Sequence, residues 1–263
     1  MVESLRAWHP RVPLLREVLY ATFEQHAYPA HTHDTWTLLV VDDGSVVYHL
    51  DRTAHRTAPT RLTLLPPHVP HDGRSAIPGT PFRKRVLYLD AHWLPSPFAG
   101  AAVASPTLES PAARAAVERV HSAIASPADA MEAEHGILEL RELVRAHLDR
   151  PASSSTRDAP LARRLRQLLD ERLTETFTLA EAGALLGAHP SHLMRVFSAT
   201  YGIAPHRYVT GRRIDRARRM LLDGHAPAEV AVESGFFDQP HLTRHFRRVL
   251  GTTPAAFAAA SAR

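Results

Sequence analysis

A chain of 263 residues with 44% apolar residues, 22% charged residues and a net charge of +4 has the balance of a soluble globular protein, which excludes disordered and fibrous classes. The absence of cysteine excludes disulfides, thiolate metal sites and cysteine nucleophiles. Because no apolar run reaches the roughly 18 to 20 residues that span a bilayer, and the first residues lack the apolar core of a signal peptide, we expect a cytoplasmic protein without a membrane partner.

Residues 35–90 show the pattern of short β-strands. The stretch TWTLLVVDDGSVVYHL consists of two apolar runs about Asp43 and Gly44, which is a strong hairpin signal. Two further apolar runs, RLTLLPP and RVLYLD, follow it. Short strands separated by proline-containing turns predict a sandwich or a barrel.

The strings HAYPAHTHDTW and LLPPHVPHDGR resemble the cupin-like, double-stranded β-helix effector domain that many AraC-family regulators carry before their DNA-binding part. The likeness covers about residues 20–95. It implies a barrel that binds a small effector, since barrel mouths are common ligand sites. Thr60 and His68 stand where that domain often has turn glycines.

Three histidines of this region are candidates for chemistry. His31 and His33 lie one residue apart on an expected strand and point the same way, and His71 comes from a neighbouring strand, so the trio can form a facial site for a divalent metal. The carboxylate of metal-binding cupins has no match, because Asp34 points to the opposite face. We therefore favour a metal-free effector pocket without a cofactor. Its expected lining is His31, His33, Trp36, Tyr48 and His71. A metal site and a purely structural role remain alternatives for the three histidines.

Residues 109–148 carry two helical stripes of apolar side chains. The first consists of Val117, Val120 and Ile124, and the second of Ile137, Leu140, Val144, His147 and Leu148. In the resembled family such helices often pair two chains, which implies a homodimer. Packing of the same stripes on the barrel explains the pattern equally well, because it is too short to establish a coiled coil.

A stretch rich in proline and serine, DRPASSSTRDAP at residues 149–160, predicts a link between two domains. Residues 1–156 hold 15 Lys or Arg against 17 Asp or Glu, whereas residues 157–263 hold 16 against 10. A basic C-terminal part favours contact with a polyanion, because Lys and Arg displace counterions condensed on phosphates. We expect a sensing and dimerisation domain at 1–150, a linker at 151–159 and a DNA-binding domain at 160–263.

The C-terminal part contains one unit twice. Residues 180–208, AEAGALLGAHPSHLMRVFSATYGIAPHRY, align with residues 228–257, AEVAVESGFFDQPHLTRHFRRVLGTTPAAF, with one extra residue in the second turn. Each unit predicts a helix, a tight turn closed by Gly187 or Gly235, and a second helix. Two short helices joined in this way form a helix-turn-helix, whose second helix fits the roughly 12 Å wide major groove.

The pattern G-F-x-D-Q-x-H-L-x-R-x-F-R-R-x-x-G-x-T-P, held from Gly235 to Pro254, resembles the signature of AraC/XylS-family transcription regulators. The first unit resembles their first helix-turn-helix, and the likeness covers about residues 160–258. It implies two units bridged by a long helix, here roughly Pro205 to Leu222, that presents both recognition helices to successive major grooves. Four arginines of this bridge are expected near solvent or phosphate, namely Arg212, Arg213, Arg216 and Arg219.

Matching positions identify the candidate DNA contacts on the two recognition helices. Arg195, Gln239 and Arg244 are suited to paired hydrogen bonds with a base edge or to phosphate, whereas Met194 offers only apolar contact. The full set is Ser191, His192, Met194, Arg195, Gln239, His241, Thr243 and Arg244. For each of them a phosphate contact or a structural role is an equal alternative.

Together these patterns predict an α+β multidomain fold: an N-terminal double-stranded β-helix (cupin-like) barrel with helices, and a C-terminal all-α tandem helix-turn-helix domain. The expected function is a transcription regulator, not an enzyme, that binds double-stranded DNA and an unknown small effector, with RNA polymerase as a further partner of an activator. One alternative is a cupin-type metalloprotein or metalloenzyme that uses His31, His33 and His71. Another is a helical adaptor that binds proteins through its basic face.

Overall fold

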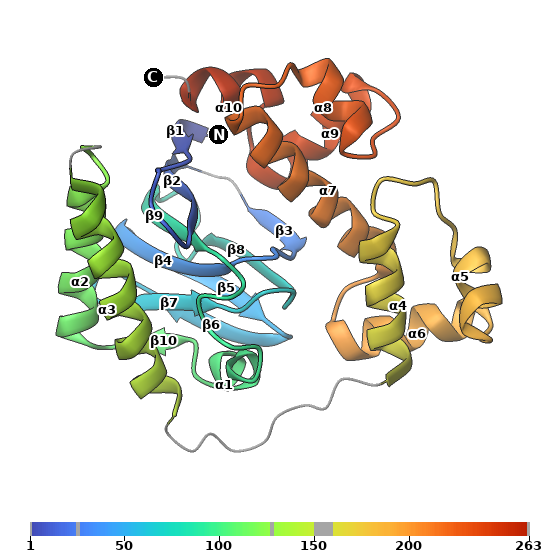
Figure 1. Ribbon diagram of the computed structural model, residues 1–263, viewed down its shortest axis with the longest axis horizontal. Coiled ribbons are helices and arrows are strands. Elements are labelled where there is room, and N and C mark those ends of the chain that lie inside the picture. The colour runs from blue at the N-terminus through green and yellow to red at the C-terminus, as the bar shows by residue number, and fades with distance from the viewer. Residues whose placement is uncertain (1, 25–26, 127–128, 150–159, 262–263) are drawn as a thin grey trace.

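The computed structural model describes residues 2–24, 27–126, 129–149 and 160–261. Two β-sheets with three helices form the N-terminal part, and seven further helices within these ranges form the C-terminal part (Figure 1). This architecture confirms the predicted fold class. The predicted linker, residues 151–159, lies outside the described residues.

The barrel consists of two antiparallel sheets. One has six strands in the order β1-β2-β9-β4-β7-β10, and the other has four strands in the order β3-β8-β5-β6. The strands are β1 (Val2–Trp8), β2 (Leu15–Phe23), β3 (Tyr28–His31), β4 (Trp36–Asp43), β5 (Val46–Leu50), β6 (Thr53–Thr57), β7 (Leu62–Leu65), β8 (His71–Ser75), β9 (Phe82–Leu89) and β10 (Thr107–Leu108).

The predicted hairpin at Asp43 and Gly44 is wrong in its pairing. The chain does turn there, and Gly44 has a positive φ of 75°. However, β4 pairs with β7 and β9, whereas β5 pairs with β6 and β8. The turn therefore carries the chain from one sheet to the other, because both apolar strands find their partners among later segments. A side chain at Gly44 would also collide with the Pro81 carbonyl, 2.6 Å from an ideal Cβ.

The helices follow the barrel in sequence. They are α1 (Phe98–Ala104), α2 (Pro111–Ala123), α3 (Ala130–Leu148), α4 (Pro160–Glu171), α5 (Leu179–Leu186), α6 (Pro190–Tyr201), α7 (Pro205–Leu222), α8 (Pro227–Glu233), α9 (Gln239–Leu250) and α10 (Pro254–Ser261). None of the helices in the described ranges combines the length and apolarity that a membrane crossing requires.

Helices α2 and α3 cover the outer face of the six-stranded sheet (Figure 1). The apolar side chains between this sheet and the two helices form a cluster that we call the outer core. Trp36, Leu38 and Val40 of β4 point into it, because every second side chain of a strand lies on the same face. Both predicted helical stripes contribute to the same core, for example through Val120 and Ile137. Their packing role is therefore confirmed, and the pairing of two chains remains a prediction.

The C-terminal helices form two helix-turn-helix units bridged by α7. Thr178 and Glu181 form the capping box that starts α5, and Gly187 ends that helix in the left-handed conformation. In the second unit, Asp238 caps α9 by accepting a hydrogen bond from the His241 amide. The bridge has the bounds that the sequence predicts, Pro205 to Leu222.

The second unit packs directly on the barrel. Helix α9 lies beside β3, and α10 lies beside β1. A single apolar cluster, which we call the shared core, contains residues of both parts. It includes Phe23, Val41 and Phe82 of the barrel with Ile214, Phe246 and Phe257 of the helices. The barrel and the second helix-turn-helix unit are thus joined by a continuous core rather than by a solvated gap.

Candidate effector cavity and nucleic-acid interface

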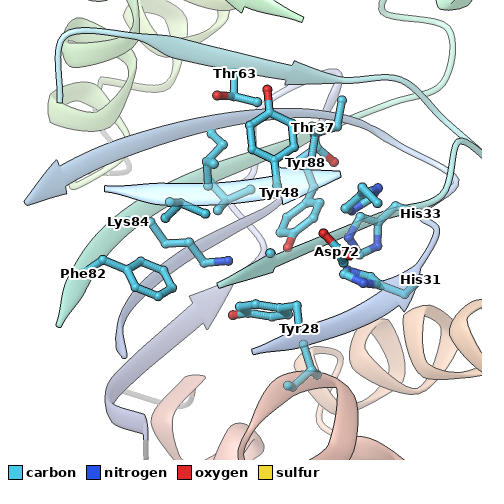
Figure 2. A pocket seen from close by; sticks show the side chains of 17 residues that line it. Tyr28, His31, His33, Thr37, Tyr48, Thr63, Asp72, Phe82, Lys84 and Tyr88 are labelled. Carbon is cyan, nitrogen blue, oxygen red and sulfur yellow. The ribbon is translucent and has the colours of Figure 1, made fainter. Parts of the chain in front are cut away.

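A cavity of about 60 Å³ lies between the two sheets. Both sheets contribute to its wall, and Leu250, the last residue of α9, completes it. Figure 2 shows the polar lining, which consists of Tyr28, His31, His33, Thr37, Tyr48, Thr63, His71, Asp72, Lys84 and Tyr88. The cavity is therefore closed in part by the second recognition helix.

Four of the five residues predicted to bind an effector meet in this cavity, namely His31, His33, Tyr48 and His71. The prediction is wrong for Trp36, which lies in the outer core and donates its indole N–H to the Leu94 carbonyl at 3.2 Å. On β4 it is Thr37 and Leu39 that line the cavity. Trp36 points away from the cavity because successive side chains of a strand lie on opposite faces, and Thr37 faces the cavity.

The three histidines gather at one end of the cavity. Nδ1 of His31 is 2.7 Å from the Pro29 carbonyl, and Nδ1 of His71 is 3.0 Å from the Val69 carbonyl. Burial is the largest cause of a lowered pKa in both His31 and His71. It lowers the pKa of His71 to about 3 and that of His31 well below its usual range. Both rings are therefore neutral near pH 7.

Lys84 is the residue that the sequence analysis missed. Its side chain is half-buried, its amino group lies 3.9 Å from the ring centre of Tyr28, and Figure 2 shows it extending into the cavity. Burial lowers the pKa of Lys84 to about 7. The available signal was composition, since Lys84 is the single lysine among 31 basic residues. No carboxylate partner of Lys84 is seen among the described residues, so a ligand anion can pair with it.

A polar network joins the cavity wall to α7. Nδ1 of His33 lies 2.8 Å from Oδ1 of Asp215, and both side chains are buried. Arg218 forms an ion pair with Glu17 of β2, and its guanidinium lies 4.5 Å from the ring centre of Tyr88. Through His33 and Tyr88, the wall of the cavity therefore contacts the helix that bridges the two helix-turn-helix units.

The bridge arginines were predicted near solvent or phosphate. Arg216 is exposed as predicted, whereas the prediction is wrong for Arg212, whose side chain is only 11% exposed. Arg212 bonds Asp34 at 3.2 Å, and Arg219 bonds the same carboxylate at 2.9 Å. Arg213 donates to the carbonyls of Leu173 and Glu175 at 2.7 and 2.8 Å. Arg216 donates to the Glu233 carbonyl at 3.0 Å. These side chains hold the two units and the barrel in place, because each finds an acceptor that lies far away in the sequence.

The two recognition helices, α6 and α9, keep one face open. The exposed positions on α6 include Ser191, His192, Met194 and Arg195. On α9, Gln239 and Arg244 are exposed, and a surface hollow is lined by Gln239, Pro240, Thr243, Arg244 and Arg247. Arg247 was missed as a candidate, although its exposed basic side chain lies one turn after Thr243. The open faces suit contact with a nucleic-acid groove.

His241 differs from its counterpart His192. Its Nδ1 accepts a hydrogen bond from the Phe237 amide at 3.3 Å, and its ring packs against Phe236 with ring centres 5.3 Å apart. It is half-buried, whereas His192 is exposed. In this structure, His241 therefore stabilises the turn of the second unit.

Comparisons with known proteins agree with this geometry. Residues 14–141 match the family described as an AraC-like ligand binding domain, and residues 182–260 match a helix-turn-helix domain. The uncharacterized HTH-type transcriptional regulator YbfI of Bacillus subtilis (strain 168) is 32% identical over 49% of this chain and 47% of its own length. The virulence regulon transcriptional activator VirF of Yersinia enterocolitica is 30% identical over 35% of this chain and 34% of its own. The chain spans half or less of the length of these curated relatives.

Among solved structures, ToxT from Vibrio cholerae O395 superposes with a TM-score of 0.64 over 98% of both chains at 11% sequence identity, which shows a common fold. The barrel, its cavity and the paired helix-turn-helix units thus define an effector domain joined to a DNA-binding domain. The chain belongs to the AraC family of transcription regulators.

Proposed function

We propose that the protein is a sequence-specific DNA-binding transcription regulator, not an enzyme, whose barrel holds a small effector. One observation carries the proposal. Helix α9 faces the effector cavity with Leu250 and faces solvent with Gln239 and Arg244. A ligand in the cavity therefore contacts the same rigid helix that is offered to DNA.

The size of the cavity limits the effector. Because a buried water needs roughly 10 to 15 Å³, a cavity of about 60 Å³ holds about four to six waters or a small ligand of similar volume. Lys84 supplies an amino group that a bound carboxylate would keep protonated, and Tyr48 and Thr63 supply hydroxyl groups. These features favour a small anion, such as a short carboxylate, over a long-chain ligand.

The proposed regulation follows from the shared wall. An effector that fits better when α9 is displaced favours that arrangement, and one that fits the closed cavity favours the arrangement described here. The change in DNA affinity is limited by the difference in effector affinity between the two arrangements. The regulator acts in the cytoplasm, and we expect a second copy of the chain and, for an activator, RNA polymerase as further partners.

Selection of bound duplexes from random DNA tests the DNA-binding half of this proposal. We expect one motif with two segments spaced by about one helical turn, roughly 34 Å, because α7 links the two recognition helices. No enrichment at moderate salt would contradict the proposal.

Lys84→Met tests the effector half. Thermal unfolding is followed while a panel of short carboxylates is added to the full chain. We expect at least one carboxylate to raise the unfolding temperature of the wild-type chain and none to raise that of Lys84→Met. The substitution keeps the volume of the side chain but removes its charge. Equal responses of both chains would contradict a role of Lys84 in recognition.

A further inference from the structure

The three cavity histidines are arranged as ligands of one ion. Their ring centres lie 4.8 Å apart for His31 and His33, 4.5 Å for His31 and His71, and 5.0 Å for His33 and His71. For a bond of about 2.1 Å from zinc to nitrogen, a ring centre lies about 3.2 Å from the ion, and angles of about 90° to 109° then separate ring centres by about 4.5 to 5.3 Å. The observed spacing falls in this range.

Hydrogen bonds fix which nitrogen of each ring is available. Carbonyl oxygens only accept, so the bonds to Pro29 and Val69 require a proton on Nδ1 of His31 and of His71. The Asp215 carboxylate has the same effect on Nδ1 of His33. Each Nε2 then carries a lone pair, and none of the three has a hydrogen-bond partner among the described residues. Three convergent lone pairs without a donor favour a cation between them.

We propose that His31, His33 and His71 bind one divalent transition-metal ion, of the class of Zn²⁺ or Co²⁺, through their Nε2 atoms. Candidate ligand atoms from the three residues already lie within 4.8 Å of one another. Imidazole suits these metals, and a site with three protein ligands leaves one position for water or for a ligand in the cavity. Asp72 lines the same cavity but does not belong to this group of converging atoms, and its carboxylate accepts a hydrogen bond from the backbone amide of His49 at 2.7 Å.

The hydrogen bond between His33 and Asp215 connects this site to the DNA-binding part. Asp215 belongs to α7, and it orients a ligand of the proposed ion through the hydrogen bond to His33. Such outer partners hold a ligand in the right tautomer and orientation. An ion at the three histidines therefore favours the position of α7 seen here. This consequence for regulation rests on the proposed function, whereas metal binding itself does not.

Metal binding by the full chain tests the proposal. The chain is stripped with a chelator, dialysed against micromolar Zn²⁺ and analysed for bound metal, and Co²⁺ is used in parallel for its absorption spectrum. We expect one ion per chain and the intense visible bands of a four-coordinate site. Less than about a tenth of an equivalent, or a spectrum of hydrated Co²⁺, would overturn the proposal without any variant.

Variants assign the ligands. His71→Gln and His33→Gln should each lose the bound ion, whereas His121→Gln, which alters a buried histidine of α2 outside the cluster, should keep it. Circular dichroism of the metal-free chains checks that the fold is retained. Retention of the ion by both His71→Gln and His33→Gln would overturn the assignment.

Asp215→Asn tests the connection between the parts. We expect its affinity for Zn²⁺ to fall by about 10- to 100-fold, the usual effect of losing an outer partner of a metal-binding histidine. An unchanged affinity would show that α7 does not support the site. Because duplex selection is read separately, failure of metal binding leaves the proposed regulator intact, and failure of selection leaves the metal site intact.

Discussion

Arg218 and Glu17 form an ion pair inside the protein, with only 3% and 6% of their side chains exposed. Removing each of the two charges from water costs several kcal/mol. Their mutual attraction offsets this cost when the geometry is good. The ring of Tyr88 lies 4.5 Å from the guanidinium and adds a favourable cation–π contact. Removing one member alone leaves the other charge buried without compensation.

We therefore predict that Arg218→Met lowers the free energy of unfolding by about 3 to 5 kcal/mol. Glu17→Leu combined with Arg218→Met should recover most of this loss, because no unpaired charge remains. Urea unfolding measures both. The exposed pair of Arg61 and Glu109 is the control, and Arg61→Ala should cost less than about 1 kcal/mol. Equal losses in Arg218→Met and Arg61→Ala would be incompatible with a buried pair.

His121 makes stability depend on pH. Burial, with a smaller contribution from Arg85, lowers its folded-state pKa to about 3, whereas an unfolded histidine has a pKa of about 6.5. Between these values the unfolded chain binds more protons, so the free energy of unfolding falls as the pH falls. For one such group the slope approaches about 1.4 kcal/mol per pH unit.

His121→Gln should accordingly make this decline shallower by about 1.4 kcal/mol per pH unit between pH 5.5 and 4. Denaturant unfolding at a series of pH values measures the slope. The exposed His135 on α3 is the control, since its side chain is hydrated in both states, and His135→Gln should leave the slope unchanged. If both variants have the wild-type slope, the assigned pKa of His121 is wrong.

At the scale of the elements, the duplicated turns differ in their surroundings. Gly187 and Gly235 both have positive φ values, 65° and 86°. An ideal Cβ on Gly187 meets no atom within 4 Å, whereas one on Gly235 lies 2.9 Å from the Thr174 backbone and 3.1 Å from the Leu173 carbonyl. Arg213 binds that carbonyl and holds it against the turn.

Gly187→Ala should lower the free energy of unfolding by about 1 to 2 kcal/mol, because a residue with a side chain is strained in the left-handed conformation. Gly235→Ala should cost more, because the backbone beside it must also move. Thermal or chemical unfolding of the two variants makes the comparison. Equal losses would show that the contact of the second turn with residues 173–174 does not constrain it.

Local signals explain why so much of the helical part was predictable. Caps, turn glycines and apolar spacing lie within a few residues of the elements that they define, and the bounds of α7 follow from Pro205 and the repeat. The partners of Arg212 and Arg219 could not be predicted in this way. Their acceptor, Asp34, is about 180 residues away and belongs to the barrel.

The candidate site shows the same division. The spacing of His31 and His33 revealed their common face, and His71 joined them as expected. The direction of Trp36 and the role of Lys84 depend on the register and pairing of β4 and β9, which local sequence does not determine. Contact of Leu250 with the cavity depends on the packing of two parts that lie far apart in the chain.

At the scale of the whole molecule, the barrel, α7 and α9 form one connected body. The shared core and the ion pairs of Asp34 and Glu17 hold the second helix-turn-helix unit on the barrel. A ligand that fills the cavity would contact α9 at Leu250, whereas α7 is connected to the cavity through the hydrogen bond between His33 and Asp215. The open faces of α6 and α9 remain available to DNA while these contacts persist.

The central claim, that these open faces bind DNA, is tested most directly by the affinity of the full chain for the selected duplex at increasing salt. We predict a steep fall in affinity, about 0.9 log units per log unit of salt for each phosphate neutralised. Arg244→Ala should weaken binding by about 1 to 3 kcal/mol, and Arg145→Ala on α3 should have no effect. Equal affinities of the two variants, or binding insensitive to salt, would contradict the claim.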